Sequence, residues 1–278
     1  TELIEIAELV TSWSASDEQV EAVVTSDRET EVRAYEGEIE SLTVAESQGI
    51  GVRVIKDGRQ GFAYAGTLEE NELLEVLSEA RDNASFASPD EFSGLAEPDG
   101  VESVSLDVYS DGVNSLATNK KIDYALELEK LTLATDKRIS GIESSEYTDV
   151  VSESAIATST GIRSSSKESG CCLMVYALAE EKGETQTGFG FSIGRNPDEL
   201  DVAKAASDAS DRATRMLGST KPKSERLTVV LDPWVSAQFL QIVGSTLSAE
   251  MVLKGRSLFA DRLGETVASP IISLVDDP

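Results

Sequence analysis

The sequence predicts an α+β protein in which helices flank antiparallel sheets in two successive domains, followed by the start of a third, incomplete β-rich domain. Apolar residues recur at helical spacing in some segments and alternate with polar residues in others, the two patterns that distinguish a helix from a half-buried strand. Stretches rich in Pro, Gly and charged residues divide the chain. The predicted domains are residues 1–87, 101–220 and 221–278, and residues 88–100 are a linker.

The first predicted domain consists of a helix, an antiparallel meander and a second helix. The opening residues place their apolar side chains at helical spacing. Five alternating segments between residues 20 and 66 then predict strands, and Asp57-Gly58 between the last two predicts a tight hairpin. Thr67 is predicted to cap the second helix, with Glu70 at the reciprocal position of a capping box.

The second predicted domain has the same pattern of strands flanked by helices, with no repeat visible at the level of residues. A short strand is predicted at residues 104–109 and a helix at residues 119–136. Ser- and Thr-rich strands follow over residues 139–194, and the Lys-Gly dipeptide at 182–183 predicts a hairpin between the last two. A helix is predicted at residues 197–217, because it starts with Pro, which is favoured in a first turn.

The third predicted domain comprises a strand at residues 227–232, a helix at residues 233–251 and a strand at the end of the chain. The last strand has no terminating signal, and a sheet that stopped there would expose an unpaired edge. This domain is therefore predicted to be incomplete.

Composition narrows the classes of function. The chain has 51 acidic and 24 basic residues, a formal net charge of −27. Such a surface repels nucleic-acid backbones and anionic membranes, so neither is predicted as a partner. High solubility accounts for the charge, and steering of a basic partner is the alternative. The sequence has no histidine, which excludes a Ser–His–Asp triad, a Cys–His pair or a His-ligated zinc site built from these residues alone.

The two cysteines bear on the cellular compartment. Cys171 and Cys172 are neighbours, so on a strand they point to opposite faces and a disulfide between them would be strained. One thiol is predicted to pack in the core, and the pattern fits a reducing compartment. The chain opens with acidic residues where a signal peptide would carry positive charge, and no apolar run reaches membrane-spanning length. The predicted location is the cytoplasm.

Two patterns that could carry chemistry have simpler structural explanations. Ser164 and Lys167 match the S-x-x-K motif of Ser–Lys acyl enzymes, but their flanks are strand-like and the other motifs of those enzymes are missing. A polar turn between two strands is therefore predicted at these residues. The glycines within residues 188–194 lack the spacing of a nucleotide-binding loop, so a tightly packed or bulged strand is predicted there.

Carboxylates are abundant but do not form a metal motif. The closest pairs, Asp198-Glu199 and Asp276-Asp277, have neither EF-hand spacing nor helical partners. Solvated surface acids are the better interpretation. No catalytic, cofactor-binding or metal-ligating residue is therefore predicted in this chain.

Two long stretches of the chain resemble a known family. They are EVRAYEGEIESLTVAESQGIGVRVIKDGRQGFAYAG at residues 31–66, and residues 196–278, which begin NPDELDVAKAASDASDRATRMLG and include LTVVLDPWVSAQFLQIVGSTLSAEM. In their order and spacing they are similar to the TldD/PmbA proteins, also called the TldD/TldE family and long labelled modulators of DNA gyrase. The resemblance covers nearly the whole chain.

The resemblance implies a subunit of a cytoplasmic TldD–TldE metallopeptidase that trims peptides and unfolded polypeptides. In that family the TldD-type subunit carries an H-E-x-x-x-H helix and the zinc. The matching positions here hold Gln241, Ile242 and Thr246, which are not useful zinc ligands. The chain is thus similar to the TldE/PmbA-type subunit, and is expected to be inactive alone and to have zinc only in a TldD-type partner. Family members are longer, so most of the C-terminal domain is expected to be absent.

Two other functions stay open. The chain could be a binding or scaffold protein that acts as a homodimer, since long polar strands and an acidic surface suit recognition. It could also regulate DNA gyrase, through protein contact rather than DNA contact because of its charge. The predicted partners are a TldD-like metallopeptidase subunit and a peptide substrate, with a homodimer as the alternative.

Overall fold

The structure is a computed structural model that describes residues 2–101, 104 and 106–275. The chain divides into two compact units, Thr1–Ser219 (unit 1) and Thr220–Pro278 (unit 2). The α+β class predicted from the sequence is confirmed. No helix in the described part of the chain has the length and apolar character needed to cross a membrane.

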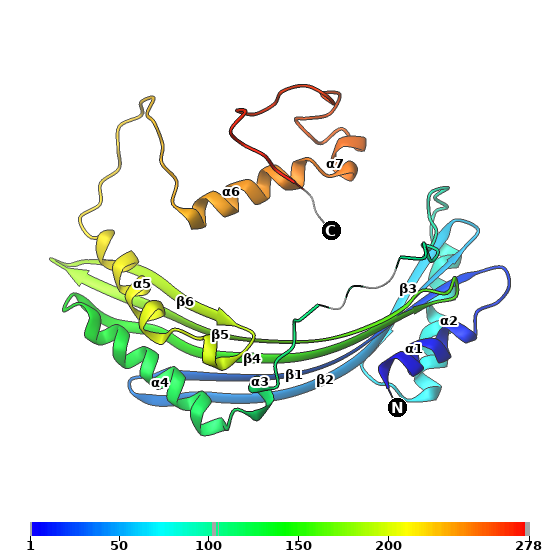
Figure 1. Cartoon of the computed structure of the whole chain (residues 1–278), viewed down its shortest axis with the longest axis horizontal. Helices are drawn as coiled ribbons and strands as arrows, with labels where there is room; N and C mark the ends of the chain where they lie inside the picture. Colours follow the sequence, from blue (N-terminus) through cyan, green and yellow to red (C-terminus); the bar gives the residue numbers. More distant parts are fainter. Residues whose placement is uncertain (1, 102–103, 105, 276–278) are drawn as a thin grey trace. The chain divides into compact units, whose positions relative to one another are not determined.

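Unit 1 is built on one six-stranded antiparallel sheet that is curved along its strands (Figure 1). The strand order is β3-β2-β1-β4-β5-β6, so β1 and β4 are paired at the centre. The first and second predicted domains therefore contribute to a single sheet. The strands are β1 (Gln19–Tyr35), β2 (Glu38–Lys56), β3 (Arg59–Ala65), β4 (Ile139–Thr158), β5 (Arg163–Glu181) and β6 (Glu184–Gly194).

Four helices cover one face of this sheet, two at each end (Figure 1). On β1, Val20 and Val24 enter an apolar cluster with α1 and α2, whereas Val32 and Ala34 enter a second cluster with α4 and α5. All four positions are even-numbered, and alternate residues of a strand share a face. The helices of unit 1 are α1 (Leu3–Ser12), α2 (Glu70–Phe86), the short α3 (Gly112–Ser115), α4 (Thr118–Thr135), the 3-10 helix η1 (Pro197–Glu199) and α5 (Val202–Arg215).

The first meander differs from its prediction, because three strands replace the five that were predicted. The polar residues near the middle of β1 and β2 do not interrupt the strands, since β1 is paired on both sides, with β2 and with β4. Glu36-Gly37 joins β1 to β2 with positive φ angles of 54° and 79°, as a type I′ hairpin requires. The predicted hairpin at Asp57-Gly58 is confirmed, with φ of 51° and 69°.

Two predicted helix starts are also corrected. The capping box at Thr67 is not formed, because Glu69 occupies the N-cap position of α2 and Thr67 lies two residues too early. The helix predicted at residues 197–217 is split into η1 and α5. Asp201 causes the second start, since its side chain accepts a hydrogen bond from the Lys204 amide at 2.8 Å.

The short strand predicted at 104–109 is absent from the described residues 106–109. This segment makes isolated backbone contacts with β5 instead of a ladder, including a 3.0 Å hydrogen bond from the Ser169 amide to the Val108 carbonyl. The hairpin predicted at Lys182-Gly183 is confirmed, with φ of 54° and 81°.

The described residues of unit 2, 220–275, form the helices α6 (Pro233–Thr246) and α7 (Ala249–Leu253). The single helix predicted at 233–251 is interrupted where Ser248 caps α7, its hydroxyl accepting from the Met251 amide. The strands predicted at residues 227–232 and near the chain end are not formed in the part that the structure describes. A strand needs a paired neighbour, and unit 2 offers none among its described residues, of which none is buried.

Candidate functional site

The structure separates the two residues of the S-x-x-K pattern. Ser164 and Lys167 both lie in the regular part of β5, where residues three apart point to opposite faces of the sheet. The Lys167 ammonium forms an ion pair with Glu153 at 2.7 Å and lies 4.6 Å from the ring centre of Tyr109. A Ser–Lys dyad is therefore not formed. The polar turn predicted at these residues is wrong, because the turn between β4 and β5 lies at residues 159–162 and both residues are paired with β4.

The two cysteines are free thiols on opposite faces of β5, one buried and one partly exposed, as predicted. Burial raises the pKa of the Cys171 thiol to about 12, and the negative charge of Asp149 acts in the same direction. Burial also raises the pKa of Cys172. Both thiols are protonated near neutral pH, so neither is an activated nucleophile.

The glycines of β6 allow close packing rather than ligand binding. A Cβ atom on Gly188 would lie 2.2 Å from the Ala213 nitrogen, and one on Gly190 would lie 1.9 Å from the Ala205 carbonyl oxygen. Only glycine fits at both positions, because α5 lies directly against the strand. The predicted tightly packed strand is confirmed.

A buried ion pair fixes α4 to the centre of the sheet. The Lys121 ammonium lies 2.5 Å from the Asp149 carboxylate, with side-chain exposures of 9% and 4%. The same ammonium donates a 3.0 Å hydrogen bond to the Thr30 hydroxyl, so it links strands β4 and β1. Tyr147 lies two residues before Asp149 on β4. Its burial is the main cause that raises the pKa of its hydroxyl, and the negative charge of Asp149 is the second.

The Lys121–Asp149 pair was not predicted from the sequence, although the position of Lys121 on its helix indicates it. Lys121 occupies the same helical stripe as Ala125, Leu128 and Thr132, all of which are buried. A lysine at the apolar spacing of a helix indicates a buried partner.

The helix α6 does not fit a zinc ion. Ile242 is 64% exposed and apolar, and the Thr246 hydroxyl donates to the Val243 carbonyl at 2.6 Å. With Gln241, these positions offer an amide, an alkyl group and a hydroxyl where zinc sites use imidazole, thiolate or carboxylate. Within residues 2–101, 104 and 106–275, no group of three or more His, Cys, Asp or Glu side chains could hold a metal ion.

The acidic pair Asp198-Glu199 lies in a short turn and has local hydrogen-bond partners. The Glu199 carboxylate accepts a hydrogen bond from the Arg195 amide at 3.0 Å, and Asp198 lies beside it in the single turn of η1. Asp276 and Asp277 lie outside the described residues.

The surface left for binding is the sheet face opposite the helices, which we call the open face. It carries the odd-numbered residues of β1 and their partners on β2 and β4. Small side chains dominate its centre: Asp27 is paired with Ser47 on β2 and with Ser152 on β4. Beside this row lies a hollow of about 360 Å³. Its lining on this face includes Glu29, Glu31, Thr148, Val150, Gly170, Cys172 and Ile193.

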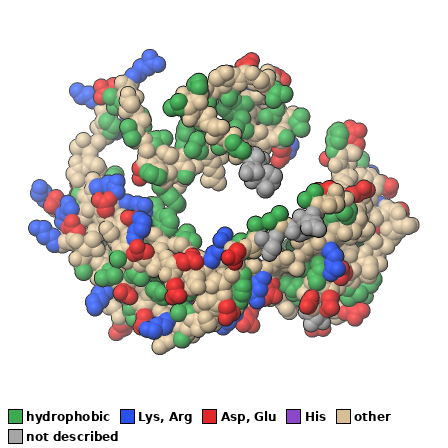
Figure 2. Space-filling model, viewed as in Figure 1, with side chains coloured by type: hydrophobic (Ala, Val, Ile, Leu, Met, Phe, Trp, Pro, Cys, Tyr) green, Lys and Arg blue, Asp and Glu red, His purple; other side chains and the backbone are tan. Residues whose placement is uncertain are grey.

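Aromatic side chains flank both ends of the open face. Phe62 and Tyr64 on β3 have ring centres 6.3 Å apart, and Phe189 and Phe191 on β6 are stacked at the same distance. Figure 2 shows that Lys and Arg side chains gather mainly at the α4 and α5 end of unit 1. The two ends therefore share aromatic character but differ in their content of Lys and Arg side chains.

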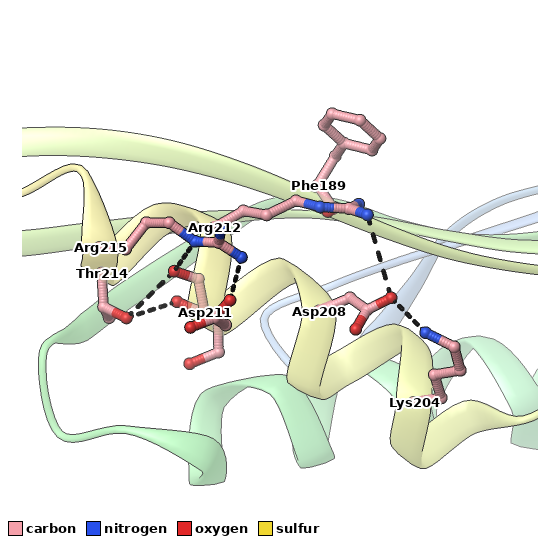
Figure 3. Close-up of polar contacts among 8 residues, drawn as sticks. Phe189, Lys204, Asp208, Asp211, Arg212, Thr214 and Arg215 are labelled. Atoms are coloured by element: carbon pink, nitrogen blue, oxygen red, sulfur yellow. Dashed lines mark hydrogen bonds and ion pairs between the residues drawn. The ribbon is translucent and has the colours of Figure 1, made fainter. Parts of the chain in front are cut away.

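Arg212 of α5 stabilises the β6 end. Its guanidinium stacks over the Phe189 ring at 4.5 Å and donates a 2.6 Å hydrogen bond to the Phe189 carbonyl. In Figure 3 the guanidinium lies between Phe189 and Asp208, which also pairs with Lys204 at 2.6 Å. The Phe189 ring points away from α5 (Figure 3).

The fold and site together define a class: an α+β protein with a helix-covered antiparallel sheet, an open polar face and a C-terminal helix without zinc ligands. Three family models match successive parts of the chain. They are PmbA/TldA metallopeptidase domain 1 at residues 20–84, the central domain at residues 111–217 and the C-terminal domain at residues 224–278. The chain belongs to the PmbA/TldD metallopeptidase family, as the resemblance predicted. The domain boundaries given above stay predictions.

Curated relatives are similar over most of this chain. A metalloprotease of Methanocaldococcus jannaschii is 27% identical, over 87% of this chain and 54% of its own length. The metalloprotease PmbA of Escherichia coli is 20% identical, over 95% of this chain and 59% of its own length. The chain thus spans little more than half the length of these relatives.

Solved structures share the fold. A protein of Bacteroides thetaiotaomicron, named as a candidate modulator of DNA gyrase, has a TM-score of 0.87 at 21% identity, over 95% of this chain and 61% of its own. TldE from Thermococcus kodakarensis has a TM-score of 0.79 at 20% identity, over 96% of this chain and 59% of its own.

Proposed function

We propose that this chain is a TldE/PmbA-type subunit of a cytoplasmic metallopeptidase complex that acts on peptides or unfolded polypeptides. The observation that carries the proposal is the identity of Gln241, Ile242 and Thr246 on α6, within the part matched to the family's C-terminal domain. These residues replace the zinc ligands expected of a TldD-type subunit. A TldD-like companion would supply the zinc and its activated water.

In this complex the chain would bind and orient the substrate. The open face offers serine and threonine hydroxyls at its centre and aromatic rings at both ends. An extended polypeptide can form hydrogen bonds with such a surface through its backbone, which gives binding without strong sequence preference. The chain's own groups would exclude water and hold the peptide, while the bond cleavage takes place on the companion.

Reconstitution tests the proposal. This chain and a TldD-like subunit from the same organism are produced separately and together, and cleavage of an unstructured peptide is measured with and without a chelator. We expect chelator-sensitive cleavage from the pair and none from this chain alone. A matched control is the pair in which both histidines of the companion's H-E-x-x-x-H helix are replaced by alanine. Failure of the two subunits to associate would contradict the proposal.

A non-enzymatic binding function is the second candidate, either as a homodimeric scaffold or as a regulator of DNA gyrase through protein contact. It is favoured by the name of the Bacteroides thetaiotaomicron structure and by the exposed polar face. Light scattering coupled to size exclusion separates the two candidates. A stable homodimer that does not bind a TldD-like subunit would support the scaffold.

A further inference from the structure

The outer edge of β2 is open over much of the strand's length. β1 pairs with β2 from Glu38 to Ile55, but β3 pairs with it only from Ile50 onward. Residues 38–49 therefore have no strand on their outer side among the residues that the structure describes. Residues 40–48 are all exposed. Such an edge presents unpaired backbone N–H and C=O groups to any extended chain.

The corresponding edge in the other half of the sheet is covered by the chain itself. β6 pairs with β5 only from Cys171 onward, which leaves the preceding residues of β5 without an outer strand. There, the Ser169 amide donates to the Val108 carbonyl at 3.0 Å, and the Ser169 hydroxyl accepts from the Ser110 amide at 2.8 Å. An extended backbone segment therefore occupies this edge, and the same position along β2 is vacant in the described part of the chain.

The side chains along the β2 edge indicate the chemistry of an occupant. Leu42 and Val44 are 41% and 50% exposed, and they lie on the same side of the strand as Glu46. Glu40 is the extra residue at the register shift, and its carboxylate pairs with Arg33 at 2.7 Å. Between residues 27 and 48 the hairpin has seven carboxylates and two arginines. Natural edges are commonly protected by Lys, Pro or bulges. This edge has no Lys or Pro, and its register shift lies near the turn, opposite Arg33 and Ala34.

We propose that the outer edge of β2, residues 41–48, binds an extended, basic segment of another polypeptide as an added strand. Apolar side chains of that segment would pack on Leu42 and Val44, and a Lys or Arg residue of it would face Glu46. A second copy of the same edge is a poorer occupant, because it would place further carboxylates on an already acidic edge. The proposal extends the proposed function and rests on it only for the idea that the chain handles polypeptides.

Peptide binding to the isolated 278-residue chain tests this proposal without a companion subunit, so its failure is distinct from a failure of the cleavage test. The probe is a fluorescent peptide, Lys-Thr-Val-Thr-Val-Thr-Lys, measured by anisotropy. Two matched peptides are compared: one with Glu in place of Lys, and one with alternate backbone amides N-methylated. We expect binding of the first peptide that weakens with salt, and at least about tenfold weaker binding of the other two.

A pair of variants locates the site. Val44→Lys places a positive charge on the edge, and Leu74→Lys places the same charge at a similarly exposed position of α2. We expect Val44→Lys to weaken peptide binding at least about tenfold and Leu74→Lys to leave it within about twofold. Absence of binding, equal binding of the N-methylated peptide, or an unchanged Val44→Lys affinity would each overturn the proposal. So would a homodimer in light scattering that Val44→Lys dissociates.

Discussion

The two halves of the sheet in unit 1 are built alike at their outer strands. In the first half, Gly61 of β3 lies against α2, where a Cβ would meet the Ala80 oxygen at 2.0 Å and the Ala84 nitrogen at 2.2 Å. In the second half, Gly188 of β6 lies against Ala209 and Ala213 of α5 with nearly the same distances, 2.4 Å and 2.2 Å. The same contact, a strand glycine against two alanines of a helix, therefore occurs in both halves of the sheet.

The similarity between the halves includes a helix side chain that donates a hydrogen bond to the backbone of the outer strand. Asn83 donates a 2.9 Å hydrogen bond to the carbonyl of Phe62, and Arg212 donates a 2.6 Å hydrogen bond to the carbonyl of Phe189. The helix segments ARDNA at 80–84 and ASDRA at 209–213 place alanines and the donor at equal spacing. The Gly–Ala contact therefore defines the backbone arrangement in both halves, whereas the hydrogen-bond donor is an amide in one half and a guanidinium in the other.

The halves differ at the first helix of each. α4 is attached through the buried Lys121–Asp149 pair, whereas α1 makes its ion pair at the surface, between Glu8 and Arg163. Lys121→Met would leave Asp149 buried without its counter-charge and is expected to lower the free energy of unfolding by about 3–5 kcal/mol. Urea unfolding followed by circular dichroism measures this.

The double variant Lys121→Met/Asp149→Leu is the control for that loss. Because both charges are removed together, it is expected to recover most of the stability. A single variant as stable as the parent protein would contradict the structural role of the pair.

The glycine contacts test whether the halves are equivalent. Gly61→Ala and Gly188→Ala would each force a helix away from its strand, and each is expected to cost about 1–3 kcal/mol of unfolding free energy. The control is Gly66→Ala, where an added Cβ meets nothing within 4 Å. Urea unfolding of the three variants should give two similar losses and one value near the parent protein. A large loss of stability for only one of Gly61→Ala and Gly188→Ala would show that the two halves are not equivalent.

The two side chains that donate to the carbonyls of Phe62 and Phe189 are expected to contribute less to stability than the glycine contacts. Asn83→Ala removes one hydrogen bond and is expected to cost about 0.5–1.5 kcal/mol. Arg212→Ala also removes the stacking on Phe189, so its loss should be larger by about 0.5–1 kcal/mol. Thermal unfolding of both variants under one set of conditions measures the difference. Equal losses would show that the stacking adds nothing.

The smallest effect is a pH dependence that comes from Glu18 in the first half. Burial acts to raise the pKa of Glu18, but hydrogen bonds from Arg81 outweigh it and hold the pKa below its usual value. A carboxyl with a depressed folded-state pKa stabilises the protein above its unfolded-state pKa and loses that contribution as the pH falls through the folded value. Glu18→Gln should therefore be less stable than the parent protein at pH 6, and the difference should shrink below about pH 4. A difference that is constant from pH 6 to pH 3 would contradict this.

Much of unit 1 could be predicted because its signals are local. The turns at Asp57-Gly58 and Lys182-Gly183 are specified by residues that accept positive φ, and the helices at the start of each half follow apolar spacing. The joining of two predicted domains into one sheet was not predictable, because β1 and β4 are more than 100 residues apart and carry no pairing signal.

For the candidate site, the sequence mainly showed which kinds of site are absent, above all a zinc site on the helix that contains Gln241. The unsuitability of Gln241, Ile242 and Thr246 for zinc follows from residue chemistry alone. The open face and the free edge of β2 could not be predicted, because both depend on which strands are neighbours. The repeat of Ala80–Ala84 and Ala209–Ala213 is too short to stand out in the sequence and becomes visible only through the glycines that it contacts.

Zinc analysis of the purified protein tests the central claim most directly, which is that this chain depends on a companion for the metal. The zinc content is measured by mass spectrometry for the chain alone and for its complex with a TldD-like subunit, after identical dialysis. We expect less than about 0.1 zinc per isolated chain and about one per complex, bound by the companion. One zinc per isolated chain, together with chelator-sensitive peptide cleavage, would contradict the account.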